Sequence, residues 1–104
     1  MKRIEFMGNS LAGIKDFPAA AKREVGYQLD RVQKGLDPID YKPMPSIGLG
    51  VKEIRIHENG EFRVLYVLAV KNKVNVLHAF RKKTQKTPKR EIETARRILK
   101  QVRS

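Results

Sequence analysis

The chain has 104 residues and a mass of 12.0 kDa, enough apolar material for one core, so we expect a single domain over residues 1–104. It has no cysteine and only two histidines, which excludes disulfides and thiolate metal sites, and we expect no metal and no cofactor. No apolar run approaches the ~20 residues that span a bilayer, and the charged start does not resemble a signal peptide. We therefore expect a cytoplasmic protein with no membrane partner.

The charge of the chain is strongly positive and unevenly placed. The net charge is +12, and residues 81–104 alone contain ten Lys or Arg against two Glu. An excess of this kind favours an anionic partner such as a nucleic acid.

The first half of the chain predicts a strand followed by helices. "KRIEFM" alternates enough for an opening strand, and a short helical turn is expected from Ser10. A longer helix should begin near residues 16–18 and stop at Gly35, because apolar residues recur between them at helical spacing. Residues 37–50 contain three prolines and two glycines and are predicted to be a loop. The helical apolar positions are Ala21, Val25, Leu29 and Val32.

Three apolar runs follow, "VKEIRI", "FRVLYVLAV" and "VNVLHAF", separated by the short polar turns "HENGE" and "KNK". This pattern is typical of an antiparallel meander. A two-residue loop at the first turn would mix polar and apolar residues on both faces. A three-residue loop over residues 58–60, with Gly60 in the left-handed position, instead pairs the apolar residues and sets Arg55 opposite Arg63.

The same loop length over residues 71–73 would place Arg81 opposite Arg63 and extend the row of arginines to a third strand. It would also place Val74, Val76 and Phe80 together on the core face. Like charges directly opposite each other cost up to about 1 kcal/mol, so the row favours an anion site. The alternative is that Glu53 or Glu61 neutralises the arginines in ordinary surface ion pairs.

The last strand runs into "AFRKKTQKTPKR", which is either a solvated linker or a phosphate-binding segment. Thr87 is predicted to cap a final helix with Pro88 at its first position. The helix should dock by an apolar stripe and expose a basic side. The stripe comprises Ile92, Ala95, Ile98, Leu99 and Val102.

The two histidines are weaker candidates for a functional role. His78 lies within an apolar strand and is expected to be a buried, hydrogen-bonded residue, and Tyr66 and Phe80 are expected in the core. His57 ends its strand at the turn, where it could titrate near neutral pH.

In element order and in two motifs, "EIR…FRVLY" and "F-x-KKTQKTP", the chain resembles the RelE/HigB-type toxins of bacterial type II toxin–antitoxin systems, in particular the phage-derived HigB-like branch. The resemblance implies an α+β, RelE-like fold with an antiparallel sheet. Its elements follow in the order strand, two helices, three-strand meander and C-terminal helix. It also implies an endonuclease that cuts mRNA on the ribosome with contacts to 16S rRNA. A cognate antitoxin, of the helix-turn-helix type, would form a hetero-oligomer with it.

Transferred residue by residue, the resemblance gives catalytic roles to Arg55, Arg63 and Lys83, with Lys83 preferred over Arg81 at the end of the last strand. The tyrosine or histidines that serve some members have no counterpart after the last strand, so Glu53 and His57 are the candidate general bases. Further RNA contacts are expected from Lys52, Arg81, Lys82, Gln85 and Lys86.

RNA supplies its own nucleophile, the 2′-hydroxyl, so cationic side chains that align the phosphate and stabilise its charge can drive cleavage to a 2′,3′-cyclic phosphate. Two other readings stay open: a nucleic-acid-binding module without catalysis, and an inactive prophage remnant.

Overall fold

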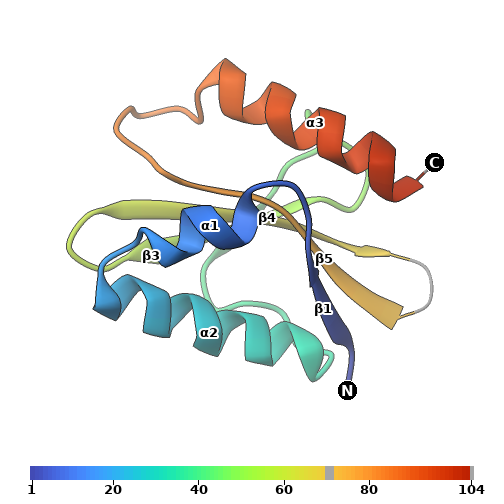
Figure 1. Ribbon diagram of the computed structural model, residues 1–104, viewed down its shortest axis with the longest axis horizontal. Helices are drawn as coiled ribbons and strands as arrows, with labels where there is room; N and C mark the ends of the chain where they lie inside the picture. Colours follow the sequence, from blue (N-terminus) through green and yellow to red (C-terminus); the bar gives the residue numbers. More distant parts are fainter. Residues whose placement is uncertain (70–71, 104) are drawn as a thin grey trace.

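The computed structural model describes residues 1–69 and 72–103, and these form a five-stranded sheet with helices on both faces (Figure 1). Helices α1 and α2 cover one face, and α3 covers the other. The strand order is β1-β5-β4-β3-β2. The elements are β1 (Arg3–Phe6), α1 (Ser10–Lys15), α2 (Ala19–Gln33), β2 (Tyr41–Pro43), β3 (Lys52–His57), β4 (Glu61–Ala69), β5 (Lys73–Arg81) and α3 (Lys89–Arg103).

The predicted α+β architecture is confirmed and is consistent with a RelE-like fold. The sheet is mixed, however, because β1 pairs parallel to β5 while the other strand pairs are antiparallel. The predicted loop over residues 37–50 also contains β2, which pairs with β3. A three-residue strand that ends in proline has too few positions to show an alternating pattern, so β2 could not be recognised from the sequence.

The predicted register of the first hairpin is confirmed. His57 pairs with Glu61 across a three-residue loop, and Arg55 lies opposite Arg63. The loop needs positive φ at two residues: Asn59 is left-handed at φ 58°, and Gly60 has φ 138°. The left-handed residue is therefore Asn59 rather than the predicted Gly60, and the glycine takes a conformation that other residues rarely adopt.

The predicted register of the second hairpin is wrong. Lys73 is already paired with Ala69, so it belongs to the strand, while Lys71 of the predicted loop lies outside the described residues. A register shift between Leu65 and Tyr66 then moves β5 by one residue. A bulge of this kind switches the faces of the residues that follow it. As a result Arg81 pairs with Phe62, and Phe80 pairs with Arg63.

Two apolar cores result, one on each face of the sheet. Val74 and Val76 pack with α1 and α2, whereas Phe80 packs with α3, which corrects the prediction that all three share one face. The predicted stripe of α3 is confirmed, since three of its members are buried in the second core and Ile92 and Val102 pack against that core. Tyr66 and Phe80 are buried as expected. His78 is mostly buried, with Nε2 2.8 Å from a carboxylate oxygen of Glu91 on α3.

The start of α3 differs from the prediction at one residue. The carbonyl of Pro88 accepts hydrogen bonds from the backbone N–H groups of Glu91 and Ile92, so proline precedes the helix, which begins at Lys89. The hydroxyl of Thr87 caps nothing; it donates to Glu53 on β3. Within the described ranges, no helix has the length and apolar character needed to cross a membrane.

Candidate functional site

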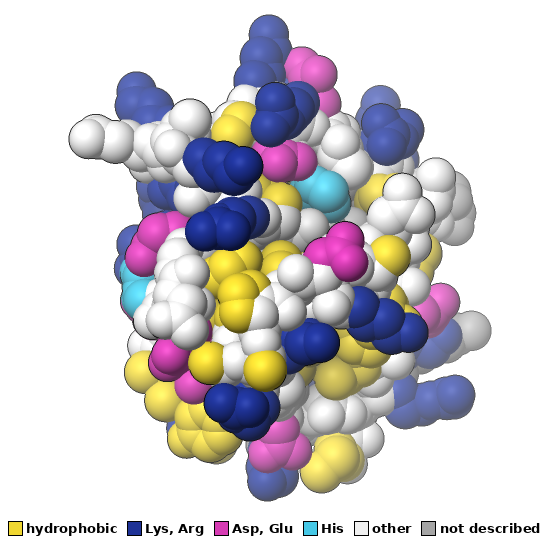
Figure 2. Space-filling view, turned by 60° about the vertical axis from the view of Figure 1, so that its left-hand side comes forward, with side chains coloured by type: hydrophobic (Ala, Val, Ile, Leu, Met, Phe, Trp, Pro, Cys, Tyr) yellow, Lys and Arg dark blue, Asp and Glu magenta, His cyan; other side chains and the backbone are white. Residues whose placement is uncertain are grey.

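A cavity of about 570 Å³ lies where β3 and β4 meet the residues before α3. Its lining includes five cationic side chains and one carboxylate, that of Glu53. Figure 2 brings forward the side on which the β3–β4 hairpin and the segment before α3 lie, and Lys and Arg side chains are spread over it with acidic groups between them. The cations that line the cavity are Lys42, Arg55, Arg63, Lys82 and Lys86.

The two arginines reach the cavity already paired with carboxylates. Arg55 Nε lies 2.8 Å from Asp40 Oδ1. Arg63 is only 5% exposed; its terminal nitrogen lies 3.1 Å from Glu61 Oε1, and its Nε lies 3.7 Å from Glu53 Oε1. The ion pairs with Glu53 and Glu61, which were the alternative to an anion site, are therefore present. Because Arg63 is buried, its pairs are not ordinary surface pairs, and the side chain is fixed in place.

The lysines of the cavity are available to a ligand. Among the described residues, no carboxylate lies within ion-pairing distance of Lys42, Lys82 or Lys86. Lys82 is anchored through its backbone, whose N–H donates to the carbonyl of Glu61 over 2.7 Å. The anion-binding capacity of the site therefore rests on ammonium groups more than on the guanidinium groups.

Three of the lysines and arginines predicted for the site lie outside the cavity. Lys83 is exposed on the segment next to it but is not part of the lining. Arg81 faces the opposite side of the sheet, where its guanidinium lies 5.6 Å from the ring centre of Phe62. Lys52 lies on the opposite face of β3 from Arg55, and its ammonium group pairs with Asp37 at 2.8 Å. Gln85 lines the cavity together with Arg55, Arg63, Lys82 and Lys86.

Of the two candidate bases, only Glu53 lines the cavity. It is 2% exposed, and its Oε2 accepts a hydrogen bond of 2.8 Å from the hydroxyl of Thr87. That bond ties the segment before α3 to β3. Glu53 is thus held between Thr87 and Arg63, with one oxygen toward each.

His57 is held between two carboxylates at the rim of the hairpin. Its Nδ1 lies 2.8 Å from a carboxylate oxygen of Glu61, and its Nε2 lies 2.7 Å from Asp40 Oδ2. These hydrogen bonds raise the pKa of His57 above its usual value. An imidazolium that donates from both nitrogens has no free lone pair, which makes His57 a poor proton acceptor here.

The same contacts act on the acids. Hydrogen bonding from His57 lowers the pKa of Glu61 against the opposing effect of burial, and Arg63 adds to the lowering. For Asp40, partial burial raises the pKa, but hydrogen bonds from His57 and Arg55 outweigh it and the pKa is lowered. Both acids are therefore carboxylates at neutral pH, and Asp40 holds Arg55 beside the cavity.

The sequence did not identify three residues of this site. Lys42 lies in the unrecognised strand β2, and Ser46 lies in the loop after it, where no pattern marks either residue. Thr87 was assigned to the helix cap, because Thr before Pro is a typical start of a helix. The pairing of β2 with β3 places Lys42 opposite Glu53, whereas the contacts of α3 and of the segment before it place Ser46 and Thr87.

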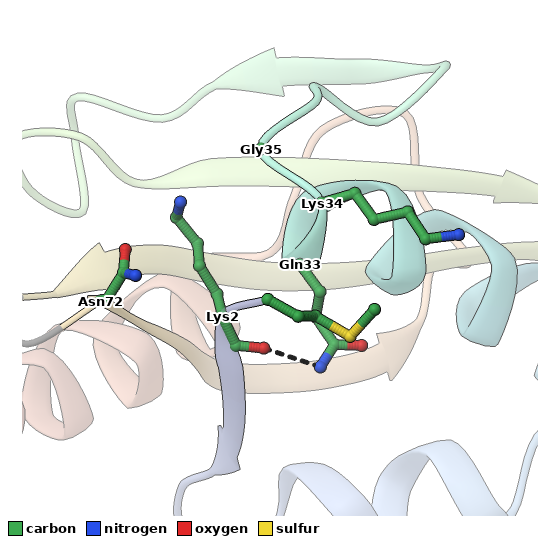
Figure 3. Close-up of a pocket in the computed structure, with 6 residues that line it drawn as sticks. Lys2, Gln33, Lys34, Gly35 and Asn72 are labelled. Carbon is green, nitrogen blue, oxygen red and sulfur yellow. Dashed lines mark hydrogen bonds between the residues drawn. The ribbon is translucent and has the colours of Figure 1, made fainter.

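A smaller cavity of about 320 Å³ lies elsewhere, between the start of the chain, the end of α2 and the turn before β5 (Figure 3). Gln33 Nε2 donates to the carbonyl of Lys2 over 2.8 Å, while Lys34 and Asn72 border the space (Figure 3). Its lining has two lysines and no carboxylate, and it shares no lining residue with the larger cavity. Within the described residues, no group of three or more His, Asp or Glu is placed to hold a metal ion.

Comparison with known families gives one match. The model of the family described as "Phage derived protein Gp49-like (DUF891)" matches residues 12–100, which include every lining residue of the larger cavity. No curated protein matches the chain.

Proposed function

Because the chain belongs to the family of phage-derived Gp49-like proteins, a family of toxins of the toxin–antitoxin type, we propose that it is the toxin of a type II pair of the HigB-like kind. In this proposal it is a cytoplasmic endonuclease that cuts mRNA on the ribosome and so inhibits translation. An antitoxin of the helix-turn-helix type would bind and neutralise it, and 16S rRNA would contact its basic surface.

The observation that carries the proposal is the cavity with five cations and one carboxylate. Three of those cations are lysines without an acidic partner among the described residues, so an anion can bind without breaking an existing ion pair. A phosphodiester brings the missing negative charge, and in this proposal the single carboxylate takes a proton. Charge stabilisation of this kind is commonly the largest contribution to phosphoryl chemistry.

The reaction can be written with the residues that line the cavity. The 2′-oxygen attacks the adjacent phosphorus, the bond from phosphorus to the 5′-oxygen breaks, and a 2′,3′-cyclic phosphate and a 5′-hydroxyl are formed. Glu53 accepts the proton of the 2′-hydroxyl, and an ammonium group of the cavity supplies the proton for the leaving oxygen. Lys82 and Lys86 stabilise the phosphoryl oxygens, Arg55 positions the backbone, and Arg63 holds Glu53 in place.

Lys82 takes the role that the resemblance gave to Lys83, because Lys82 lines the cavity and Lys83 does not. The two residues therefore offer a matched test. In a translation reaction with primer extension on the mRNA, Lys82→Ala should lower the cleavage rate by about 10²-fold, the scale of losing one oxyanion donor. Lys83→Ala should stay within a few-fold of wild type, as should the distant control Lys22→Ala.

Equal losses of cleavage rate in the Lys82 and Lys83 variants would show that the net charge of the segment matters and that a position in the cavity does not. A product that ends in something other than a 2′,3′-cyclic phosphate would exclude the 2′-hydroxyl mechanism. The Glu53→Gln variant should lose cleavage while retaining ribosome binding, because it removes the proton acceptor and no cation.

A second function, nucleic-acid binding without catalysis, is favoured by one observation: both arginines of the cavity are already paired with carboxylates. Such a protein would bind RNA with a strong dependence on salt concentration but would leave the mRNA intact. Growth arrest on expression, relieved by Lys82→Ala, distinguishes the toxin from this binding module.

A further inference from the structure

The larger cavity has an apolar side that phosphate binding does not use. The end of β2 and the loop after it contribute Pro43, Met44 and Pro45, and α3 contributes Ile92. The two prolines have no backbone N–H, so this part of the lining presents carbon surface rather than hydrogen-bond donors. We name these four residues the apolar wall.

The apolar wall is fixed by contacts behind it. The backbone N–H of Met44 donates to the carbonyl of Val51 over 2.9 Å, and Arg96 Nε on α3 donates to the carbonyl of Ser46 over 2.7 Å. Gly48 lies so close to Leu99 that even a Cβ atom there would overlap that side chain. The loop is therefore held against α3 in a preformed shape, which reduces the entropy lost when a ligand binds.

The size of the cavity also exceeds what a phosphate needs. A volume of 570 Å³ lies in the range of roughly 300–1,000 Å³ that holds ligands of the size of a nucleotide. Lysines on one chain segment and carbon surface on another match a ligand that is anionic at one end and flat and apolar at the other. A ribonucleotide has this chemistry, with its phosphate at one end and its base at the other.

We propose that the cavity binds one unstacked ribonucleotide, with its phosphate at Lys82 and Lys86 and its base against the apolar wall. The inference rests on the proposed function and extends it, because it makes the apolar wall the part of the site that selects single-stranded RNA. A base inside a duplex must be unpaired and unstacked, at a cost in free energy, before it can enter the cavity. Double-stranded RNA therefore binds less well than a single strand.

Two polar side chains of the lining give the base a means of recognition. Ser46 and Gln85 line the cavity, and neither side chain is hydrogen-bonded to another described residue. A hydroxyl and an amide can each donate and accept, so together they can bind the edge of a base. Gln85 belongs to the same segment as the two lysines, and Ser46 follows the apolar wall.

The test is binding of small probes to the full chain, followed by the shifts of backbone amide signals in NMR spectra. The probes are adenosine 3′-monophosphate, ribose 5-phosphate and inorganic phosphate. The nucleotide should bind about tenfold tighter than ribose phosphate, as expected from about 60 Å² of apolar base surface removed from water. It should shift the amides of Met44 and Ile92, whereas inorganic phosphate should shift only those near Lys82 and Lys86.

Two variants separate the base from the phosphate. Pro45→Ser should abolish most of the tenfold preference for the nucleotide over ribose phosphate while leaving the affinity for inorganic phosphate unchanged. Lys86→Ala should weaken the binding of both the nucleotide and inorganic phosphate. Leu49→Ala is the matched control, because Leu49 lies in the same loop and is 86% exposed but does not line the cavity. Equal affinity for nucleotide and ribose phosphate, or shifts confined to the lysine segment, would overturn the inference.

Mononucleotide binding requires no cleavage and no ribosome, so the two proposals can fail separately. A chain that binds the nucleotide at the apolar wall but leaves mRNA intact would contradict the nuclease and retain the nucleotide site. A chain that cleaves mRNA without any preference for the base would retain the nuclease and contradict the nucleotide site.

Discussion

Replacing Arg63 by methionine tests whether the centre of the site is a structural ion pair. The side chains of Arg63 and Glu53 are 6% and 3% exposed, so the change leaves an uncompensated carboxylate inside the protein. Breaking a buried pair in this way costs about 3–5 kcal/mol. The 3.7 Å separation of Arg63 Nε and Glu53 Oε1 places the expected loss near the lower end, at about 3 kcal/mol.

The matched variants are Glu53→Gln and the double variant that combines Arg63→Met with Glu53→Gln. Glu53→Gln should cost less than Arg63→Met, because Arg63 keeps Glu61 at 3.1 Å. The double variant should be more stable than Arg63→Met alone, because no unpaired charge stays buried. Urea unfolding followed by far-ultraviolet circular dichroism at pH 7 measures all three free energies of unfolding.

The reasoning would be refuted if Arg63→Met lowered the free energy of unfolding by less than Glu53→Gln does. It would also be refuted if the double variant were no more stable than Arg63→Met. The result also bears on function, because loss of cleavage in an Arg63 variant can come from unfolding. Lys82 is less buried and unpaired among the described residues, so its variants report on chemistry more directly.

Two further predictions concern stability. Gly13→Ala should destabilise the protein by about 1–3 kcal/mol, because the new Cβ would lie 2.7 Å from the carbonyl oxygen of Ala79. Thermal unfolding measures this loss of stability. An unchanged melting temperature would contradict the prediction and show that α1 can move away from β5. Since the pKa of His57 is raised in the folded state, its ion pairs with Asp40 and Glu61 stabilise the protein fully below its unfolded pKa of about 6.5 and are lost as the pH rises through the folded pKa. The melting temperature of His57→Gln should therefore fall below that of wild type at pH 6 and approach it at pH 9, and a difference that does not change with pH would contradict this.

Much of the site could be predicted because some of its geometry is local. The pairing of Arg55 with Arg63 follows from alternation along two adjacent strands and from the length of one turn, both visible in the sequence. The basic segment after β5 was also recognisable, and Lys82, Gln85 and Lys86 do line the cavity. The choice between Lys82 and Lys83 was not predictable, because a segment without regular structure has no period that assigns side chains to a face.

The sequence by itself determined the order of every element except β2, the register of the first hairpin and the apolar stripe of α3, since each depends on residues close together in the chain. Only the tertiary structure decided the rest. The bulge in β5 turned Arg81 to the opposite face, α3 packed on β5 and β4 over the face that holds the buried Arg63, and the segment before α3 brought Thr87 to Glu53. The contact of Thr87 with Glu53 joins residues 34 positions apart, and its geometry depends on how both faces of the sheet are covered at once.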